Sequence, residues 1–337
     1  MPLGSLKSIL ISRTDSLGDV TLTLPLVGYL KSIDPGVHIV FLGSSYAQPL
    51  VDCCGFVDEF VNYTSLKQLP LQEQVDEIAK LNVDAVLHVF PVAHIARLMK
   101  SAKVPVRIGT FHRAFHWFTC NRFVSFSRKK SELHESQLNF KLLRGLGINF
   151  IPRLIEIPAW YGLKPKDQVP DWLAAQLDSA RFKLILHPKS KGSAREWGLD
   201  HFVTLTKLLP KDRFQLIVSG TAEEGEQMQP LFAQVGELVL NVTGKLSLSE
   251  FIALIAASDG IVAASTGPLH ISAALGKKAL GLFAPMKPIH PGRWKPVGAQ
   301  ADFLVIDKDC NDCRKGGVCA CILALEPNQV AEWFIGK

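Results

Sequence analysis

The chain has 337 residues, enough for two domains of about 150 residues each. Hydrophobic residues make up 47% and charged residues 20% of the chain, a balance that excludes a disordered protein. No apolar run reaches the roughly 20 residues of a membrane-spanning helix, the N-terminus is too short for a signal peptide, and seven cysteines are too few for a disulfide framework. We therefore expect a cytoplasmic protein with reduced thiols and no transmembrane segment.

Short apolar runs alternate with helix-like segments, and this alternation predicts an α/β fold with a parallel sheet in each half. Prolines interrupt regular structure between Pro152 and Pro170, so we expect an N-terminal domain over residues 1–160 and a C-terminal domain over 161–337. The sequence leaves open that the last helix packs back on the N-terminal domain. The expected strands are Ile9–Ser12, Val37–Gly43, Ala85–Phe90, Val106–Gly109, Phe123–Phe126, Lys183–His187, Phe214–Gly220, Leu238–Val242, Gly260–Ala264 and Ala279–Ala284.

The first expected strand leads into Arg13–Val20, where an acidic residue stands at the start of a helix. Gly18 allows a ligand or another backbone to come close, and Asp19 lies at the carboxyl end of the strand, where parallel sheets bind ligands. The alternative is that Asp19 only caps the helix, since Asp is a good N-cap residue. Asp15 is a rival for any chemical role of Asp19.

The net charge of +6 is concentrated in one segment of the first half. Between Ala85 and Ser131 there is no Asp or Glu, which favours an anionic partner such as a phosphorylated lipid, an acidic sugar or a membrane surface. A solvated basic surface is the alternative. No nucleic-acid-binding module surrounds the segment, so we do not expect a nucleic-acid partner. The nine basic residues are Arg97, Lys100, Lys103, Arg107, Arg113, Arg122, Arg128, Lys129 and Lys130.

Two segments of the second half are suited to binding a diphosphate. The loop after His187 offers Ser190, Lys191 and Arg195, whose charges and hydroxyl can hold phosphate oxygens, although a solvated loop is the alternative. Further on, a strand ends at Ala264 and a helix follows, with free N–H groups and the positive end of its dipole at the N-terminus. The residues at that helix start are Ser265, Thr266, Gly267, Pro268 and His270.

Three weaker patterns complete the second half. Glu223 and Glu224 follow an expected strand, where an acid can bind ribose hydroxyls or simply lie on a solvated helix start. Leu246 precedes a helix with a Ser247–Glu250 capping box and could border a base. Four thiols have spacing that could hold a structural metal: Cys310, Cys313, Cys319 and Cys321.

Taken together and in this order, these motifs resemble glycosyltransferase family 9, the bacterial heptosyltransferases of lipopolysaccharide core assembly. The similarity spans nearly the whole chain. The stretches that carry it are Arg13–Pro25 (RTDSLGDVTLTLP), Val104–Gly109, Leu133–Glu135, the loop before Trp197, Ser265–His270 and Pro285–Trp294.

The resemblance implies a GT-B architecture, with two Rossmann-like domains facing a central cleft. It also implies inverting transfer of heptose from ADP-heptose to the lipopolysaccharide inner core, without a required metal or other cofactor. Asp19 would be the general base. The donor would be held by Ser190, Lys191, Arg195, Glu223, Leu246, Ser265, Thr266, Gly267 and His270.

The acceptor would be an anionic lipid core at the inner face of the inner membrane, gripped by Arg107, Arg113 and Arg122. Ser265 stands where close relatives that use ADP-heptose often have Asp. Two alternatives stay open: a family member that uses another nucleotide sugar or a protein acceptor, and a non-catalytic nucleotide-binding or scaffold protein.

Overall fold

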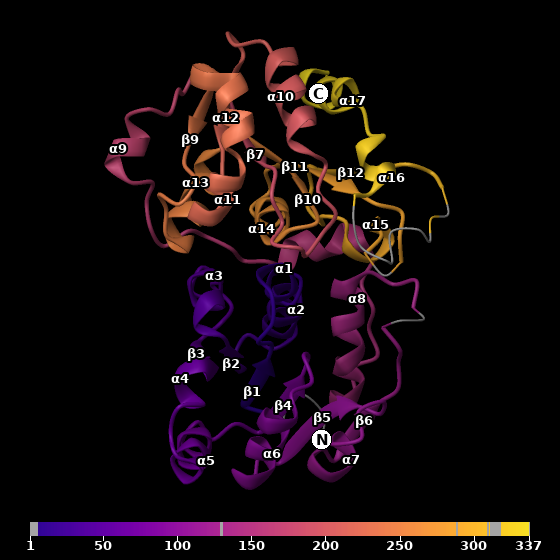
Figure 1. Ribbon diagram of the computed structural model, residues 1–337. Coiled ribbons are helices and arrows are strands. Elements are labelled where there is room, and N and C mark those ends of the chain that lie inside the picture. Colours follow the sequence, from indigo (N-terminus) through magenta and orange to yellow (C-terminus); the bar gives the residue numbers. More distant parts are fainter. Residues whose placement is uncertain (1–5, 129–130, 288, 309, 311–317, 337) are drawn as a thin grey trace. The chain divides into compact units, whose positions relative to one another are not determined.

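The computed structural model describes residues 6–128, 131–287, 289–308, 310 and 318–336. The chain divides into two compact units, Met1–Lys164 and Pro165–Lys337, and the division falls within the predicted proline-rich connector. Each unit contains one sheet of six parallel strands with helices packed around it (Figure 1). The structure thus confirms the predicted α/β class with a parallel sheet in each half.

The N-terminal unit has the strand order β3-β2-β1-β4-β5-β6. The order reverses between β1 and β4, which pair in parallel with Ile9 opposite Ala85 and Ser12 opposite His88. All five residues of β1 are buried. The strands are β1 (Ser8–Ser12), β2 (His38–Gly43), β3 (Glu59–Asn62), β4 (Ala85–His88), β5 (Val106–Thr110) and β6 (Arg122–Val124).

Short helices connect these strands, and α2 packs against α8 in the same unit. Three 3₁₀ segments, Ser45–Ala47, Lys141–Leu146 and Leu154–Trp160, complete the described part of the unit. The helices are α1 (Leu17–Thr21), α2 (Leu24–Ile33), α3 (Gln48–Asp52), α4 (Tyr63–Leu66), α5 (Leu71–Lys80), α6 (Ala93–Ser101), α7 (His116–Thr119) and α8 (Glu135–Phe140).

The C-terminal unit repeats this topology, with the strand order β12-β11-β10-β7-β8-β9 and a reversal between β7 and β10. In both units the first strand of the unit lies beside the fourth, which is the doubly wound Rossmann order. The strands are β7 (Phe182–His187), β8 (Phe214–Val218), β9 (Val239–Asn241), β10 (Gly260–Ala264), β11 (Lys278–Phe283) and β12 (Ala301–Val305).

The helices of the C-terminal unit include the predicted capped helix, in which the Ser247 side chain accepts from the Glu250 N–H and Glu250 accepts from the Ser247 N–H. Gly276, at φ +75°, follows α14 in the left-handed conformation that commonly ends a helix. The helices are α9 (Asp171–Ala174), α10 (Leu199–Leu208), α11 (Ala222–Gln227), α12 (Gln229–Val235), α13 (Leu248–Ala257), α14 (Gly267–Ala274), α15 (Pro291–Trp294), α16 (Ala320–Leu323) and α17 (Pro327–Ile335).

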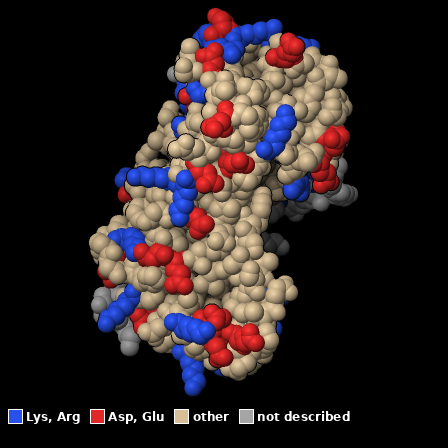
Figure 2. Space-filling model, turned by 90° about the vertical axis from the view of Figure 1, so that its left-hand side faces the viewer, with Lys and Arg blue, Asp and Glu red and all other residues tan. Residues whose placement is uncertain are grey.

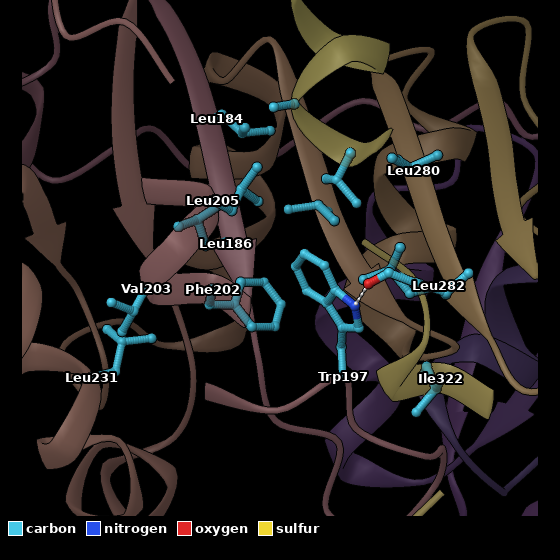
Figure 3. Close-up of a cluster of buried hydrophobic side chains, with 14 of the residues drawn as sticks. Leu184, Leu186, Trp197, Phe202, Val203, Leu205, Leu231, Leu280, Leu282 and Ile322 are labelled. Atoms are coloured by element: carbon cyan, nitrogen blue, oxygen red, sulfur yellow. Dashed lines mark hydrogen bonds between the residues drawn. The ribbon is translucent and has the colours of Figure 1, made fainter. Parts of the chain in front are cut away.

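Trp197 lies in a cluster of buried hydrophobic side chains in this unit (Figure 3). Its indole Nε1 donates to the Leu325 carbonyl at 2.8 Å, and its ring contacts Phe202 edge-on. The bond ties the segment before α17 to the loop that leads into α10. The last helix, α17, packs on α10 of its own unit. Among the described residues, no helix combines the length and the apolarity that a bilayer crossing requires.

Candidate active site

The carboxyl end of β1 carries the acidic residues predicted from the sequence. Helix α1 begins at Leu17 with Ser16 as its N-cap, so Asp19 lies in the first turn and is not the capping residue. Its carboxylate accepts hydrogen bonds from the Arg13 guanidinium and from the Ser16 hydroxyl. Its side chain is about one-fifth exposed, with a relative accessibility of 18%. Asp19 is therefore held in place by two donors while it remains open to a ligand.

Arg13 is the centre of this site, although its guanidinium is buried. Its Nε donates to Asp15 Oδ1 at 2.7 Å, and a terminal nitrogen donates to Asp15 Oδ2 at 3.0 Å. Burial acts against the charge of Arg13, but the carboxylates of Asp19, Asp15 and Glu135 outweigh it and raise the Arg13 pKa above its ordinary value. Arg13 is a permanent cation that fixes the positions of both aspartates.

The two aspartates differ in their electrostatic surroundings. Burial is the largest influence on Asp15 and, together with the nearby Asp19 charge, raises its pKa to about 6 despite the opposing effect of Arg13. Both Asp15 oxygens are occupied by one guanidinium, in the bidentate geometry that orients a side chain strongly. Asp15 thus orients Arg13 with both of its oxygens, whereas Asp19 divides its carboxylate between Arg13 and the Ser16 hydroxyl.

A second layer of buried charge supports Arg13 from α8. Glu135, which is 1% exposed, accepts from Arg13 at 3.4 Å and also from Arg128. Asn139, one turn later, accepts from Arg128 at 3.1 Å and donates to the Leu22 carbonyl at 3.1 Å. Sequence reasoning identified Leu133–Glu135 only as a landmark of the family and missed its role as a buried ionic bridge.

The three arginines predicted to grip an acceptor separate into two groups. Arg107 donates to the backbone carbonyls of Thr119 and Val104, and Arg122 donates to the Gly145 carbonyl at 2.8 Å. Both stand near the beginnings of their strands, away from the edge that carries Asp19. These bonds hold loops of the N-terminal unit together, and a role of Arg107 and Arg122 in binding an acceptor stays a prediction. Arg113, exposed just beyond the carboxyl end of β5, remains a candidate for acceptor binding.

In the C-terminal unit, the loop after β7 lies at the equivalent strand reversal. The Ser190 N–H donates to Glu196 Oε1 at 3.0 Å and its hydroxyl donates to the Ala194 carbonyl at 3.0 Å, so Ser190 closes the loop on itself. Lys189 pairs with the same carboxylate at 2.6 Å. Lys191, at φ +47°, is exposed on the turn, and Arg195 is half-buried. Glu196 is a positioning residue that the sequence did not reveal.

The start of α14 lies at the end of the neighbouring strand β10. Thr266 is the N-cap residue and is 5% exposed, yet its hydroxyl makes no side-chain capping bond and has no hydrogen-bond partner among the described residues. Gly267 and Pro268 form the first turn, as predicted, between the half-buried Ser265 and the buried His270. A buried hydroxyl beside the first N–H groups of a helix is suited to donate hydrogen bonds to the oxygen of an anion.

The turns after β8 and β9 also lie at the carboxyl ends of strands in the C-terminal sheet. The Gly244 N–H donates to the Gly220 carbonyl at 3.0 Å, and a Cβ at Gly244 would come within 2.8 Å of Ala222. This close packing brings the turn of the half-buried Leu246 against the start of α11, where Glu223 is exposed. Glu224 instead closes the α11 capping box with Thr221. Both predicted donor-binding positions thus lie on adjacent turns.

His187 is a further buried group at this edge, which sequence reasoning treated only as the end of a strand. Its Nδ1 lies 2.9 Å from the Ser219 hydroxyl, and its ring stacks on Phe251 with centroids 6.1 Å apart. Burial lowers the His187 pKa to about 4, although Glu224 and Glu196 oppose the shift. His187 is therefore neutral at physiological pH.

The four-cysteine motif lies only partly within the described residues. Cys310, Cys319 and Cys321 are buried, while Cys313 lies outside the described ranges. Over the part of the chain that the structure describes, no group of three or more His, Cys, Asp or Glu side chains is placed to hold a metal. The structural metal site stays a prediction.

A buried histidine in the N-terminal unit leads to a prediction about acid stability. Burial, followed by the nearby His116 and Arg107, lowers the His88 pKa to about 3, from 6.5. Because the unfolded chain binds the proton more readily, stability falls as pH decreases from about 6.5 towards 3, by about 3 kcal/mol at roughly pH 4. Urea unfolding at a series of pH values would measure the slope.

The matched variant for this test is His88→Leu. Neither ring nitrogen of His88 has a hydrogen-bond partner among the described residues, so an apolar side chain should be tolerated at neutral pH. The variant should lose less stability in acid than the parent protein does. The same replacement at the exposed His112 should leave the slope unchanged. Identical acid slopes in all three proteins would contradict the assignment.

The topology of the two sheets defines the class of protein. Two doubly wound parallel sheets in one chain are the GT-B architecture of glycosyltransferases. A family model described as glycosyltransferase family 9 (heptosyltransferase) matches residues 83–320. The chain belongs to this family and is a glycosyltransferase.

Comparison with individual proteins agrees with this assignment. A Haemophilus influenzae protein named "Putative glycosyltransferase" is 26% identical over 93% of this chain and 90% of its own length. A family 9 glycosyl transferase from Veillonella parvula has a TM-score of 0.79 at 20% identity, covering 98% of this chain and 96% of that one. E. coli ADP-heptose lps heptosyltransferase II has a TM-score of 0.74 at 20% identity, with 98% coverage of both chains. These structural likenesses show the shared fold.

Proposed function

We propose that this glycosyltransferase is an inverting heptosyltransferase that moves heptose from ADP-heptose to the lipopolysaccharide inner core. The proposal is supported by the description of the family model as heptosyltransferase and by the fold shared with an ADP-heptose lps heptosyltransferase. The observation that carries it is the Asp19 carboxylate, which two donors hold at the carboxyl edge of β1.

In this mechanism Asp19 accepts the proton of the acceptor hydroxyl as that oxygen attacks the anomeric carbon. The bond from this carbon to the diphosphate breaks, and the configuration at the carbon inverts. Proton transfer by a positioned carboxylate contributes about 10²–10⁴-fold to a rate. Arg13 and Ser16 would keep the carboxylate oriented, and Arg113 would contribute positive charge towards an anionic acceptor.

The C-terminal unit would bind the donor and stabilise the leaving ADP. Lys191, Arg195, the Thr266 hydroxyl and the Gly267 N–H would hold the diphosphate, while Leu246 and Glu223 would border the nucleoside. Loss of one such donor typically costs about 10²–10³-fold in rate. Because cationic side chains and a helix N-terminus are present to offset the developing charge, we propose no metal cofactor.

Nucleotide preference tests the donor assignment. ADP and ADP-sugars are expected to raise the unfolding temperature of the protein more than UDP-, GDP- or CMP-sugars, because a ligand that binds only the folded state stabilises it by about 2.7 kcal/mol at a hundredfold excess over its Kd. Differential scanning fluorimetry with this panel measures the preference.

Variants at the proposed diphosphate site provide the control for the panel. Thr266→Val keeps the shape of the side chain and removes the unpartnered hydroxyl, so it should reduce the ADP-induced shift. Lys80→Ala, on the exposed face of α5, should leave that shift unchanged. A preference for uridine nucleotides would favour a family member with another donor. ADP binding without turnover on any acceptor would favour a non-catalytic nucleotide-binding protein.

We further propose that the acceptor is lipid-borne and that the protein acts at the cytoplasmic face of the inner membrane. The basic segment 85–131 supports this location, since it contains no acidic residue. A protein acceptor is the alternative, and transfer assays with both acceptor types would distinguish them.

A further inference from the structure

The region around α7 exposes an unusual concentration of aromatic side chains. Phe111, Trp117, Phe118 and Phe123 are 51%, 53%, 73% and 43% exposed. Phe111 contacts Trp117 and Phe123, with ring centroids 5.7 and 6.2 Å away. These four residues, which we call the aromatic surface, come from one stretch of thirteen residues that begins just after β5 and ends within β6. Large contiguous apolar patches generally mark interaction sites.

Helix α7 is fixed to the unit by two buried residues, and this orients the rings of Trp117 and Phe118 towards the solvent. His116 is buried, and its Nδ1 lies 3.0 Å from the Thr110 carbonyl. Thr119 is also buried and its hydroxyl donates to the Phe115 carbonyl at 2.8 Å. The two residues between them, Trp117 and Phe118, consequently point to the opposite side of this short helix. The exposure of these rings follows from how α7 is anchored.

The polar groups of the aromatic surface are already paired. Trp117 Nε1 donates to the Phe111 carbonyl at 2.8 Å, and Lys100 Nζ donates to the Phe118 carbonyl at 2.8 Å. The indole ring can therefore enter an apolar phase without leaving its N–H unpaired, which would cost free energy. An aromatic ring with a satisfied polar group is typical of the boundary between water and a bilayer.

The charges around the aromatic surface determine which partner fits. Helix α6 contacts α7 and presents the exposed Arg97 and Lys100 at helical spacing, with Lys103 just beyond and Arg113 beside Phe111. Residues 85–131 contain no Asp or Glu that could offset them. By contrast, acidic and basic side chains are interspersed on the face that Figure 2 shows. A cationic rim around aromatic rings complements anionic lipid headgroups, each Lys or Arg adding to the attraction.

We infer that the aromatic surface, with the exposed basic residues of α6 and Arg113, docks the N-terminal unit on an anionic lipid bilayer. A second copy of the chain fits less well, because a symmetric contact of this patch with itself would bring like charges together. The inference deepens the proposed function, whose acceptor is lipid-borne, but bilayer binding requires no turnover and is tested separately from transfer.

Vesicle flotation of the full-length protein tests the docking. The protein is expected to float with vesicles of phosphatidylethanolamine and phosphatidylglycerol, and to float less with phosphatidylcholine vesicles or at high salt. Trp117→Ser with Phe118→Ser should reduce flotation on the order of tenfold. Ile155→Ser, at an equally exposed apolar residue of the same unit, should have no effect.

Substitutions of basic residues at two different places distinguish the contribution of the exposed basic residues of α6 from that of positive charge elsewhere on the protein. Arg97→Gln with Lys100→Gln should weaken flotation and its salt dependence, whereas Lys80→Gln on α5 should not. Hydrogen-exchange protection of β4 and β5 equal to that of the parent protein would show that the N-terminal unit of each variant is folded. Unchanged ADP-induced stabilisation would separate a failure of docking from a failure of the proposed function.

A conservative variant keeps the test decisive if the serine variants unfold. Lipids brominated near the headgroup should quench part of the tryptophan fluorescence of the bound protein. That part should disappear in Trp117→Phe, which keeps an aromatic ring and should still float. The inference is overturned if the parent protein does not float, if quenching persists in Trp117→Phe, or if the serine variants only change self-association.

Discussion

Replacing Asp19 by Asn is expected to lower the transfer rate by about two to four orders of magnitude, because the amide cannot accept the acceptor's proton. Its size and its ability to accept a hydrogen bond from Arg13 are retained, so the surrounding network should survive. In the proposed mechanism the C-terminal unit binds ADP, so ADP binding should be unaffected. Steady-state kinetics with saturating donor, together with ADP-induced thermal stabilisation, measure the two effects.

Asp15→Asn is the matched control for this variant. Both Asp15 oxygens accept from Arg13, so the substitution should disturb positioning and cause a smaller loss of rate. Because Asp15 has a pKa of about 6 in the parent protein, its replacement should also alter the acid limb of the pH–rate profile. If Asp19→Asn retains turnover and Asp15→Asn abolishes it, Asp15 is the base and our mechanism is wrong.

The central strands could be predicted from the sequence because both of their faces are covered. All five residues of β1 and of β10 are buried, so each forms an uninterrupted apolar run. The prediction missed β3 and β12, each at the edge of its sheet. The residues of β12 are only half-buried, and Glu59 of β3 is exposed, so neither strand has such a run.

Site residues could be predicted where their position relative to a strand end or a helix start is visible in the local sequence. Asp19 at a strand end and Thr266 before a helix follow from local sequence, and both lie where expected. Tertiary partners do not follow from local sequence. Nothing in residues 104–122 indicates that Arg107 bonds the carbonyls of its own loop. Nor does spacing indicate that Glu135 reaches Arg13, because 122 residues separate them.

The repeated topology explains why the two halves could hold different sites at the same place in the fold. In each sheet the strand order reverses beside the first strand of the unit. At each reversal, the loops that follow the two neighbouring strands start next to each other at the carboxyl edge of the sheet. In the N-terminal unit one of these loops provides acids around a buried cation. In the C-terminal unit the loop after β7 provides cations and hydroxyls, and the loop after β10 provides hydroxyls and a helix N-terminus. The difference in function comes from the loops and not from the sheets.

The buried bridge formed by Glu135 leads to the second large effect. Glu135→Gln should destabilise the N-terminal unit by about 3–5 kcal/mol, because it leaves Arg13 and Arg128 without their shared carboxylate in a buried environment. The half-buried Glu156, which pairs with the exposed Arg153 at 3.3 Å, offers a control: Glu156→Gln should produce no measurable change. The same chemical replacement thus compares a buried ion pair with one at the surface.

Hydrogen exchange during urea unfolding is the suitable measurement, because two units of one chain need not unfold together. Peptides from β1, β4 and α8 should lose protection at lower urea in Glu135→Gln, while peptides from the C-terminal unit should not change. The transfer rate should also fall under conditions where the variant is folded, since Arg13 orients Asp19 and Glu135 positions Arg13. A fall in stability with full activity would show that the bridge supports the fold alone, and that Asp19 is held by its nearest neighbours without help from α8.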